Sequence, residues 1–80
     1  MNQSELRREA YNYILQLMRK VPAASTIDPS TLISLDDLIL LKEGTADPSP
    51  ALVEGIKQMF LGAIPETDID AHMVEPFKNK

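Results

Sequence analysis

The most regular hydrophobic pattern in the chain starts within residues 4–20, a stretch that contains neither proline nor glycine. Apolar side chains recur there at steps of three and four residues, which is typical of an amphipathic helix. The residues of this stripe are Leu6, Ala10, Tyr13, Ile14, Leu17 and Val21. Asn2 and Glu5 have the spacing of a capping box, and Ser4 competes for the same role. The pattern predicts a long N-terminal helix.

The apolar surface of this first helix is wider than a simple core-facing stripe. Tyr11, Leu15 and Met18 extend it to roughly half of the helix circumference, whereas a core-facing helix needs a stripe of about 100°. Something must cover the extra flank, either another part of the chain or a second molecule. We favour the chain itself.

Proline, glycine and capping residues divide the rest of the chain into shorter helical segments. We expect a turn over residues 28–33, a helix from Leu35 to about Glu43 ended by Gly44, a helix from Pro50 to about Leu61 ended by Gly62, and a brief helix through Val74. The expected N-caps of the last three are Ser34 (paired with Asp37), Ser49 and Thr67. Alternating strand patterns are missing. The expected fold class is all-α, a compact small bundle of four to five short helices.

The length of 80 residues is enough for one domain and not two. We expect a single helical domain over residues 1–76 and a frayed tail over residues 77–80, from which Phe77 can fold back onto the bundle. The first helix should pack across a hairpin made by the segments 35–43 and 50–61. The predicted core is Leu6, Ile14, Leu17, Leu35, Leu38, Ile39, Leu41, Leu52, Ile56, Met59 and Phe60. Because the segment 35–43 is apolar on nearly every side, it should be central or lie partly in an interface.

The composition argues against catalysis and metal binding. Cysteine is absent and His72 is the single histidine, so thiolate nucleophiles and Cys-containing metal sites are excluded. The adjacent Asp36 and Asp37 would point about 100° apart on a helix and cannot share a proton. The alternating acids of the segment 66–70 fail as a calcium loop, because the position that needs glycine holds Met73. We therefore expect a non-enzymatic protein with no catalytic, cofactor-binding or metal-binding residues.

The chain has no pattern that would direct it to a membrane. Its longest apolar run, Leu38 to Leu41, is far shorter than the roughly 20 residues of a membrane-spanning helix. The first nine residues are polar and include two acids, unlike a signal or transit peptide. We expect a soluble cytoplasmic protein that does not engage a membrane.

Residues 38–62 read as a helix, a glycine stop, a proline-containing loop and a second amphipathic helix. The positions that carry this pattern are Gly44, Pro48, Ser49, Ile56, Phe60 and Gly62. The stretch resembles the C-terminal half of a lambda-repressor-like (Cro/C1-type) helix-turn-helix domain. That resemblance implies a DNA-binding transcriptional regulator whose recognition helix lies in the major groove.

The charges depart from what that family needs for DNA binding. The chain has 12 acidic against 8 basic side chains, for a net charge of -4, and no basic residue lies between Lys20 and Lys42. The counterpart of the recognition helix begins with Asp36 and Asp37, which phosphates would repel. Phosphate or acidic-partner contacts would have to come from the N-terminal helix, from Arg7, Arg8, Arg19 and Lys20. A plain solvated face explains these cations better, so nucleic acid is a disfavoured partner.

The surplus of apolar surface favours a different function. We expect a small regulatory protein–protein interaction module, an adaptor or antagonist of a regulator, with helix-turn-helix-type DNA binding as the alternative. The predicted partner-binding residues are Tyr11, Leu15, Met18 and Leu40. The partner would be another protein or a second copy in a homodimer.

Overall fold

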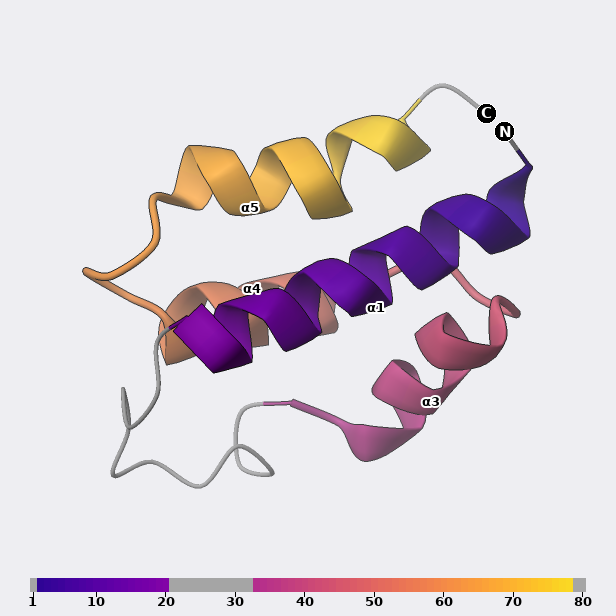
Figure 1. Ribbon diagram of the computed structural model, residues 1–80, viewed down its shortest axis with the longest axis horizontal. Coiled ribbons are helices and arrows are strands. Elements are labelled where there is room, and N and C mark those ends of the chain that lie inside the picture. The colour runs from indigo at the N-terminus through magenta and orange to yellow at the C-terminus, as the bar shows by residue number, and fades with distance from the viewer. Residues whose placement is uncertain (1, 21–32, 79–80) are drawn as a thin grey trace.

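The computed structural model describes residues 2–20 and 33–78 of the chain (Figure 1). Its helices are α1 (Gln3–Lys20), α3 (Leu35–Glu43), α4 (Pro50–Met59) and α5 (Glu66–Met73), followed by the 3₁₀ turn η1 (Glu75–Phe77). Strands are absent from the described residues, so the predicted all-α fold is confirmed. The predicted turn over 28–33 lies outside the described residues except for Ile33, whose side chain is buried.

The helices are arranged around α1. In Figure 1, α1 runs between α5 and α3, and α4 lies behind it. The backbone of α1 packs against α3 and also contacts α5, while α4 packs against α5. We expected α1 to cross a hairpin of the third and fourth helices. It does lie on α3, but the main helical neighbour of α4 is α5.

Three of the predicted helix ends are confirmed. The Asn2 side chain accepts a hydrogen bond from the Glu5 N–H at 2.9 Å. The Ser49 hydroxyl accepts one from the Leu52 N–H at 3.1 Å. Gly44 ends α3 with a φ of 74°, in the left-handed region that glycine tolerates best. These local signals set where the helices begin and end.

Three other predicted ends differ. Ser34 stands at the start of α3 but makes no side-chain capping bond, and Asp37 instead accepts a hydrogen bond from the Ser49 hydroxyl at 3.2 Å. Thr67 is not the cap of α5, because Pro65 occupies that position. Helix α4 ends at Met59 rather than near Leu61.

The segment after α5 packs onto the bundle. Helix α5 ends at Met73, close to the predicted end at Val74, and Pro76 lies within η1, since proline is tolerated in a first helical turn. Phe77 is half-buried and packs against the core, so the expected folding back of this side chain is confirmed.

The core forms mainly between α1, α4 and α5. Its buried residues are Ala10, Tyr13, Ile14, Leu17, Ile33, Leu41, Leu52, Val53, Ile56, Met59, Phe60, Ile69 and Met73. Ile14, Leu41 and Ile56 are fully buried, as predicted, whereas Leu6 and Leu38 are half-buried. Because a side chain as large as Phe60 fills space that neighbours cannot reclaim, its burial contributes several kcal/mol, on the order of 3 to 5.

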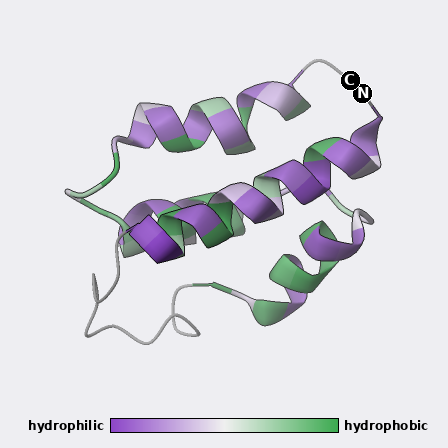
Figure 2. Cartoon of the chain, in the orientation of Figure 1, coloured by the Kyte–Doolittle hydropathy of each residue, from purple (hydrophilic) through white to green (hydrophobic). Residues whose placement is uncertain are grey.

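Two predicted core residues are wrong. Leu35 is 64% exposed and Ile39 is 50% exposed, because the short α3 turns only one narrow side, with Leu41, into the core. Figure 2 shows hydrophobic colouring on successive turns of α3. Much of that apolar surface therefore faces away from the core.

Candidate interaction site

An apolar groove opens between α1 and α3. It has a volume of about 260 Å³ and is lined by Tyr11, Ile14, Leu15, Met18, Leu35, Leu38, Ile39 and Lys42. Tyr11, Met18 and Leu38 are half-buried against the core, so they anchor the walls of the groove to the rest of the fold. The exposed Leu35 and Ile39 stand on its α3 side. We call this hollow the α1–α3 groove.

The predicted partner-binding residues fall into two groups. Tyr11, Leu15 and Met18 come together in the α1–α3 groove. Leu40 does not line it, although the side chain is 39% exposed. At about 100° per residue, Leu40 turns away from Ile39 and the groove. The structure instead brings in Leu35 and Ile39, which we had assigned to the core.

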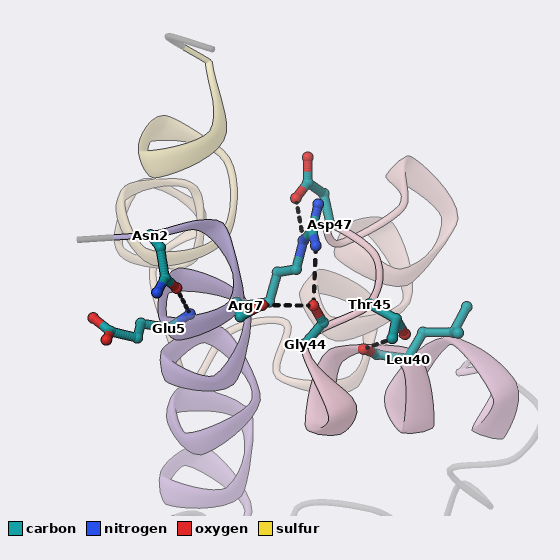
Figure 3. A network of polar contacts seen from close by, with 8 residues as sticks. Asn2, Glu5, Arg7, Leu40, Gly44, Thr45 and Asp47 are labelled. Carbon is teal, nitrogen blue, oxygen red and sulfur yellow. Dashed lines mark hydrogen bonds and ion pairs between the residues drawn. The ribbon is translucent and has the colours of Figure 1, made fainter.

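Arg7 is an internal tether rather than a free cation. Its Nε donates a hydrogen bond to Asp47 at 2.7 Å, and a second guanidinium nitrogen donates to the Gly44 carbonyl at 3.0 Å (Figure 3). The Ser4 hydroxyl donates to the same carbonyl at 3.2 Å. These bonds hold the start of α1 against the loop that follows α3, so Arg7 is not available for a phosphate or an acidic partner.

The other predicted basic residues are exposed on α1. Arg8, Arg19 and Lys20 make no ion pair within the part of the chain that the structure describes. At about 100° per residue, Arg8 and Arg19 lie within about 40° of the groove residue Leu15, whereas Lys20 lies about 140° away. Arg8 and Arg19 therefore form a basic edge along the α1 side of the groove.

The opposite edge of the groove is acidic. Asp36 and Glu43 are exposed on α3 and, among the described residues, make no ion pair. Helical geometry places them about 40° to 60° beyond Ile39, on the side of that residue away from Leu35 and Lys42. The α1–α3 groove thus runs between a basic edge and an acidic edge.

A second cluster of charges lies between α4 and α5. Lys57 of α4 lies 2.9 Å from Asp70 and 3.9 Å from Glu66, both of α5. The hydrogen bond to Asp70 raises the pKa of the Lys57 ammonium. A wide hollow of about 520 Å³ beside this pair mixes acids, lysines and apolar groups, including Val53 and Phe77.

Tyr13 joins α1 to α5 in a contact that sequence reasoning missed. Its hydroxyl donates a hydrogen bond to Asp68 at 2.6 Å, and its ring stacks on His72 with the ring centroids 4.0 Å apart. Burial, together with the bond to Asp68, raises the pKa of the Tyr13 phenol. A phenol held in its neutral form is a hydrogen-bond donor, as it is here toward Asp68. Tyr13 and Asp68 are 55 residues apart, and no local spacing signals their contact.

The acids considered for calcium have other partners. Glu66 and Asp70 lie beside Lys57, and Asp68 accepts the hydrogen bond of Tyr13. Within residues 2–20 and 33–78, no group of three His, Asp or Glu side chains is arranged to hold a metal ion. In the same residues, no helix combines the length and the apolar character needed to cross a membrane.

Comparisons with known proteins found no match to this chain among family models, curated proteins or solved structures. The resemblance of residues 38–62 to a helix-turn-helix domain therefore stays a prediction.

Proposed function

We propose that the protein is a small, non-enzymatic regulatory interaction module, an adaptor or antagonist of a regulator, that binds a helical segment of a protein partner in the α1–α3 groove. Amphipathic helices commonly dock by laying their apolar face into such a groove, with anchors at helical spacing.

The observation that carries the proposal is the exposure of Leu35 and Ile39 beside the groove. Each apolar Å² removed from water contributes about 25 cal/mol, so covering these side chains and Leu15 favours association. Contiguous apolar surface of this kind marks interaction sites more often than singly scattered hydrophobic residues do. The polar cluster of Tyr13 and His72 supports the non-enzymatic assignment, because its groups are engaged in packing contacts.

Site-specific photo-crosslinking in the source cells tests this proposal. A benzophenone amino acid at position 15 should capture a protein partner, and the same amino acid at the exposed Gln16 should not. Gln16 lies about 100° around α1 from Leu15, away from the groove. Equal capture at both positions, or none at position 15, would argue against a docking site here.

The captured protein is then purified and titrated against defined variants. We expect Leu15→Asp to weaken its binding at least about tenfold, which corresponds to about 1.4 kcal/mol. Gln16→Asp, the matched control, should bind as the wild type does. If both variants bind with the wild-type affinity, the groove is not the binding surface.

DNA binding is the second candidate, and the exposed pair Arg8 and Arg19 is the observation in its favour. Exposed Asp36 at the start of α3 and the internal pairing of Arg7 weigh against it. Binding to a labelled duplex at low salt separates the two functions. A DNA-binding role requires an affinity that falls steeply with salt and disappears in the Arg8→Ala/Arg19→Ala/Lys20→Ala variant. A flat titration rejects it.

A further inference from the structure

We propose that the occupant of the α1–α3 groove is a second copy of this chain, so that two copies form a symmetric dimer in which α3 of each lies on the groove of the other. This inference rests on the proposed function and names the partner.

The first support is that the chain carries both a groove and a matching ridge. Leu35 and Ile39 project from α3 with 64% and 50% of their surface exposed, at helical spacing of i and i+4. They cannot fill their own groove, because they stand on its α3 side. On a second copy, the same two side chains form an apolar ridge, and an apolar groove accepts a ridge of this kind.

The second support is the order of charges across the face. Arg8 and Arg19 border the groove on α1, and Asp36 and Glu43 border it beyond Ile39 on α3. A two-fold axis that runs along the groove exchanges these two edges. The basic edge of one copy then faces the acidic edge of the other on both sides of an apolar centre.

Several of the cations that lie elsewhere have acidic partners of their own. Arg7, Lys57 and Lys78 each have an acidic partner within the chain. The four charged residues of the two edges have none among the described residues. A foreign helix would need two flanks of opposite sign in the right order, whereas a second copy has them by symmetry.

The expected dimer is concentration-dependent, because α3 has only 9 residues and offers a short contact.

Charge inversion gives a test that needs no unknown partner. One variant carries Arg8→Glu and Arg19→Glu, so that both of its edges are acidic. The other carries Asp36→Lys and Glu43→Lys, so that both of its edges are basic.

Sedimentation velocity of these proteins, alone and mixed, measures the assembly. We expect the wild type to become dimeric as its concentration rises and each variant alone to stay monomeric. The equimolar mixture should dimerise, because each acidic edge then meets a basic one. A control whose net charge changes by the same +4 as that of the second variant, Glu9→Lys/Glu54→Lys at exposed positions away from the groove, should dimerise like the wild type. Circular dichroism confirms that each variant is helical.

Two results would overturn the inference. A wild type that stays monomeric at every concentration excludes the second copy. A wild type that dimerises while the mixed variants stay monomeric excludes this arrangement of edges. If the monomeric wild type still captures a protein through position 15, and Leu15→Asp loses it, the proposed function stands and the occupant is another protein. If dimerisation holds but no other protein is captured, self-association is the whole use of the groove.

Discussion

The two sides of this small bundle differ in how completely their apolar side chains are buried and their charges are paired. On the α4–α5 side, apolar side chains such as Ile56 and Ile69 are fully buried, and Lys57 is paired with Asp70. On the α1–α3 side, Leu35 and Ile39 remain exposed beside a groove, and the charges along its edges have no partner among the described residues. Leu61, 68% exposed in the turn after α4, is an isolated exception on the first side.

This difference separates the residues that stabilise the fold from the residues that are available for binding. Burial and internal ion pairs on the α4–α5 side stabilise the folded chain without help. Apolar groups left in water on the α1–α3 side add little to folding, but they add to association when a partner covers them. The two sides should therefore respond differently to the same kind of substitution.

Truncation of large apolar side chains should give the largest contrast. Phe60→Ala is expected to lower the free energy of unfolding by about 3 to 5 kcal/mol, because it leaves a cavity in the core. Leu35→Ala on α3 should change it by no more than about 0.5 kcal/mol. Urea unfolding of dilute protein measures both. If Phe60→Ala does not fold, Ile56→Val should still cost about 0.5 to 1.5 kcal/mol. Equal losses at Phe60 and Leu35 would erase the distinction between the two sides.

The two glycines with positive φ test how tightly α1 lies on α3. Alanine at either Gly44 or Gly62 has to adopt a left-handed backbone, which costs roughly 1 to 2 kcal/mol. At Gly44 the new Cβ would also lie 3.1 Å from the Ser4 Cβ and 3.2 Å from the Ser4 carbonyl oxygen, whereas at Gly62 nothing lies within 4 Å. We expect Gly44→Ala to lower the thermal midpoint more than Gly62→Ala. The reverse order would mean that α1 does not approach Gly44 this closely.

The neighbouring Arg7 and Arg8 allow the stability contribution of a paired charge to be compared with that of an unpaired one. Arg7→Ala should cost about 1 to 2 kcal/mol of stability, since it removes two hydrogen bonds from a site where the Arg7 and Asp47 side chains are only 21% and 18% exposed. Arg8→Ala should be neutral within about 0.5 kcal/mol. Chemical unfolding near neutral pH makes the measurement. A neutral Arg7→Ala would show that the start of α1 does not depend on this tether.

The smallest expected contrast is between Tyr13 and Tyr11, on opposite sides of α1, and it concerns stability and its dependence on pH. Because the pKa of Tyr13 is raised in the fold, the unfolded chain releases this proton first as pH climbs past about 10. Stability from Tyr13 is thus fully present below that pH and is lost above it. Tyr13→Phe should remove this loss and cost about 1 kcal/mol at neutral pH. Tyr11→Phe, in the groove, should change stability at neutral pH by no more than about 0.5 kcal/mol. Identical profiles for wild type and Tyr13→Phe would contradict the burial of this phenol.

Much of the fold could be predicted from local sequence. The caps at Asn2 and Ser49 and the stop at Gly44 depend on residues close in the chain, so spacing alone identifies them. Burial was harder to predict for short helices. In α3 and α5, apolar residues occur on several sides or are few, and the packing of neighbours decides which of them face inward. Leu35 and Ile39 were therefore assigned to the core, and Ile69 and Met73 were overlooked.

The candidate site could be predicted only on its α1 side. The wide apolar stripe of α1 indicated that Tyr11, Leu15 and Met18 would meet another surface. The identity of the facing side chains depends on how α3 is rotated, which no local pattern specifies, so Leu40 was chosen in place of Ile39. The role of Arg7 was hidden for a similar reason, because its partner Asp47 lies 40 residues away.

Urea unfolding of wild type and Ile39→Asp at increasing protein concentration tests most directly whether the α1–α3 face is an association surface. At low concentration we expect the two free energies of unfolding to agree within about 0.5 kcal/mol, because half of the Ile39 surface is exposed in the single chain. As concentration rises, the wild-type midpoint should increase by mass action while that of Ile39→Asp stays constant. A deficit of about 2 kcal/mol or more in Ile39→Asp that is the same at every concentration would show that Ile39 packs within the fold, and would contradict the proposed role of this face.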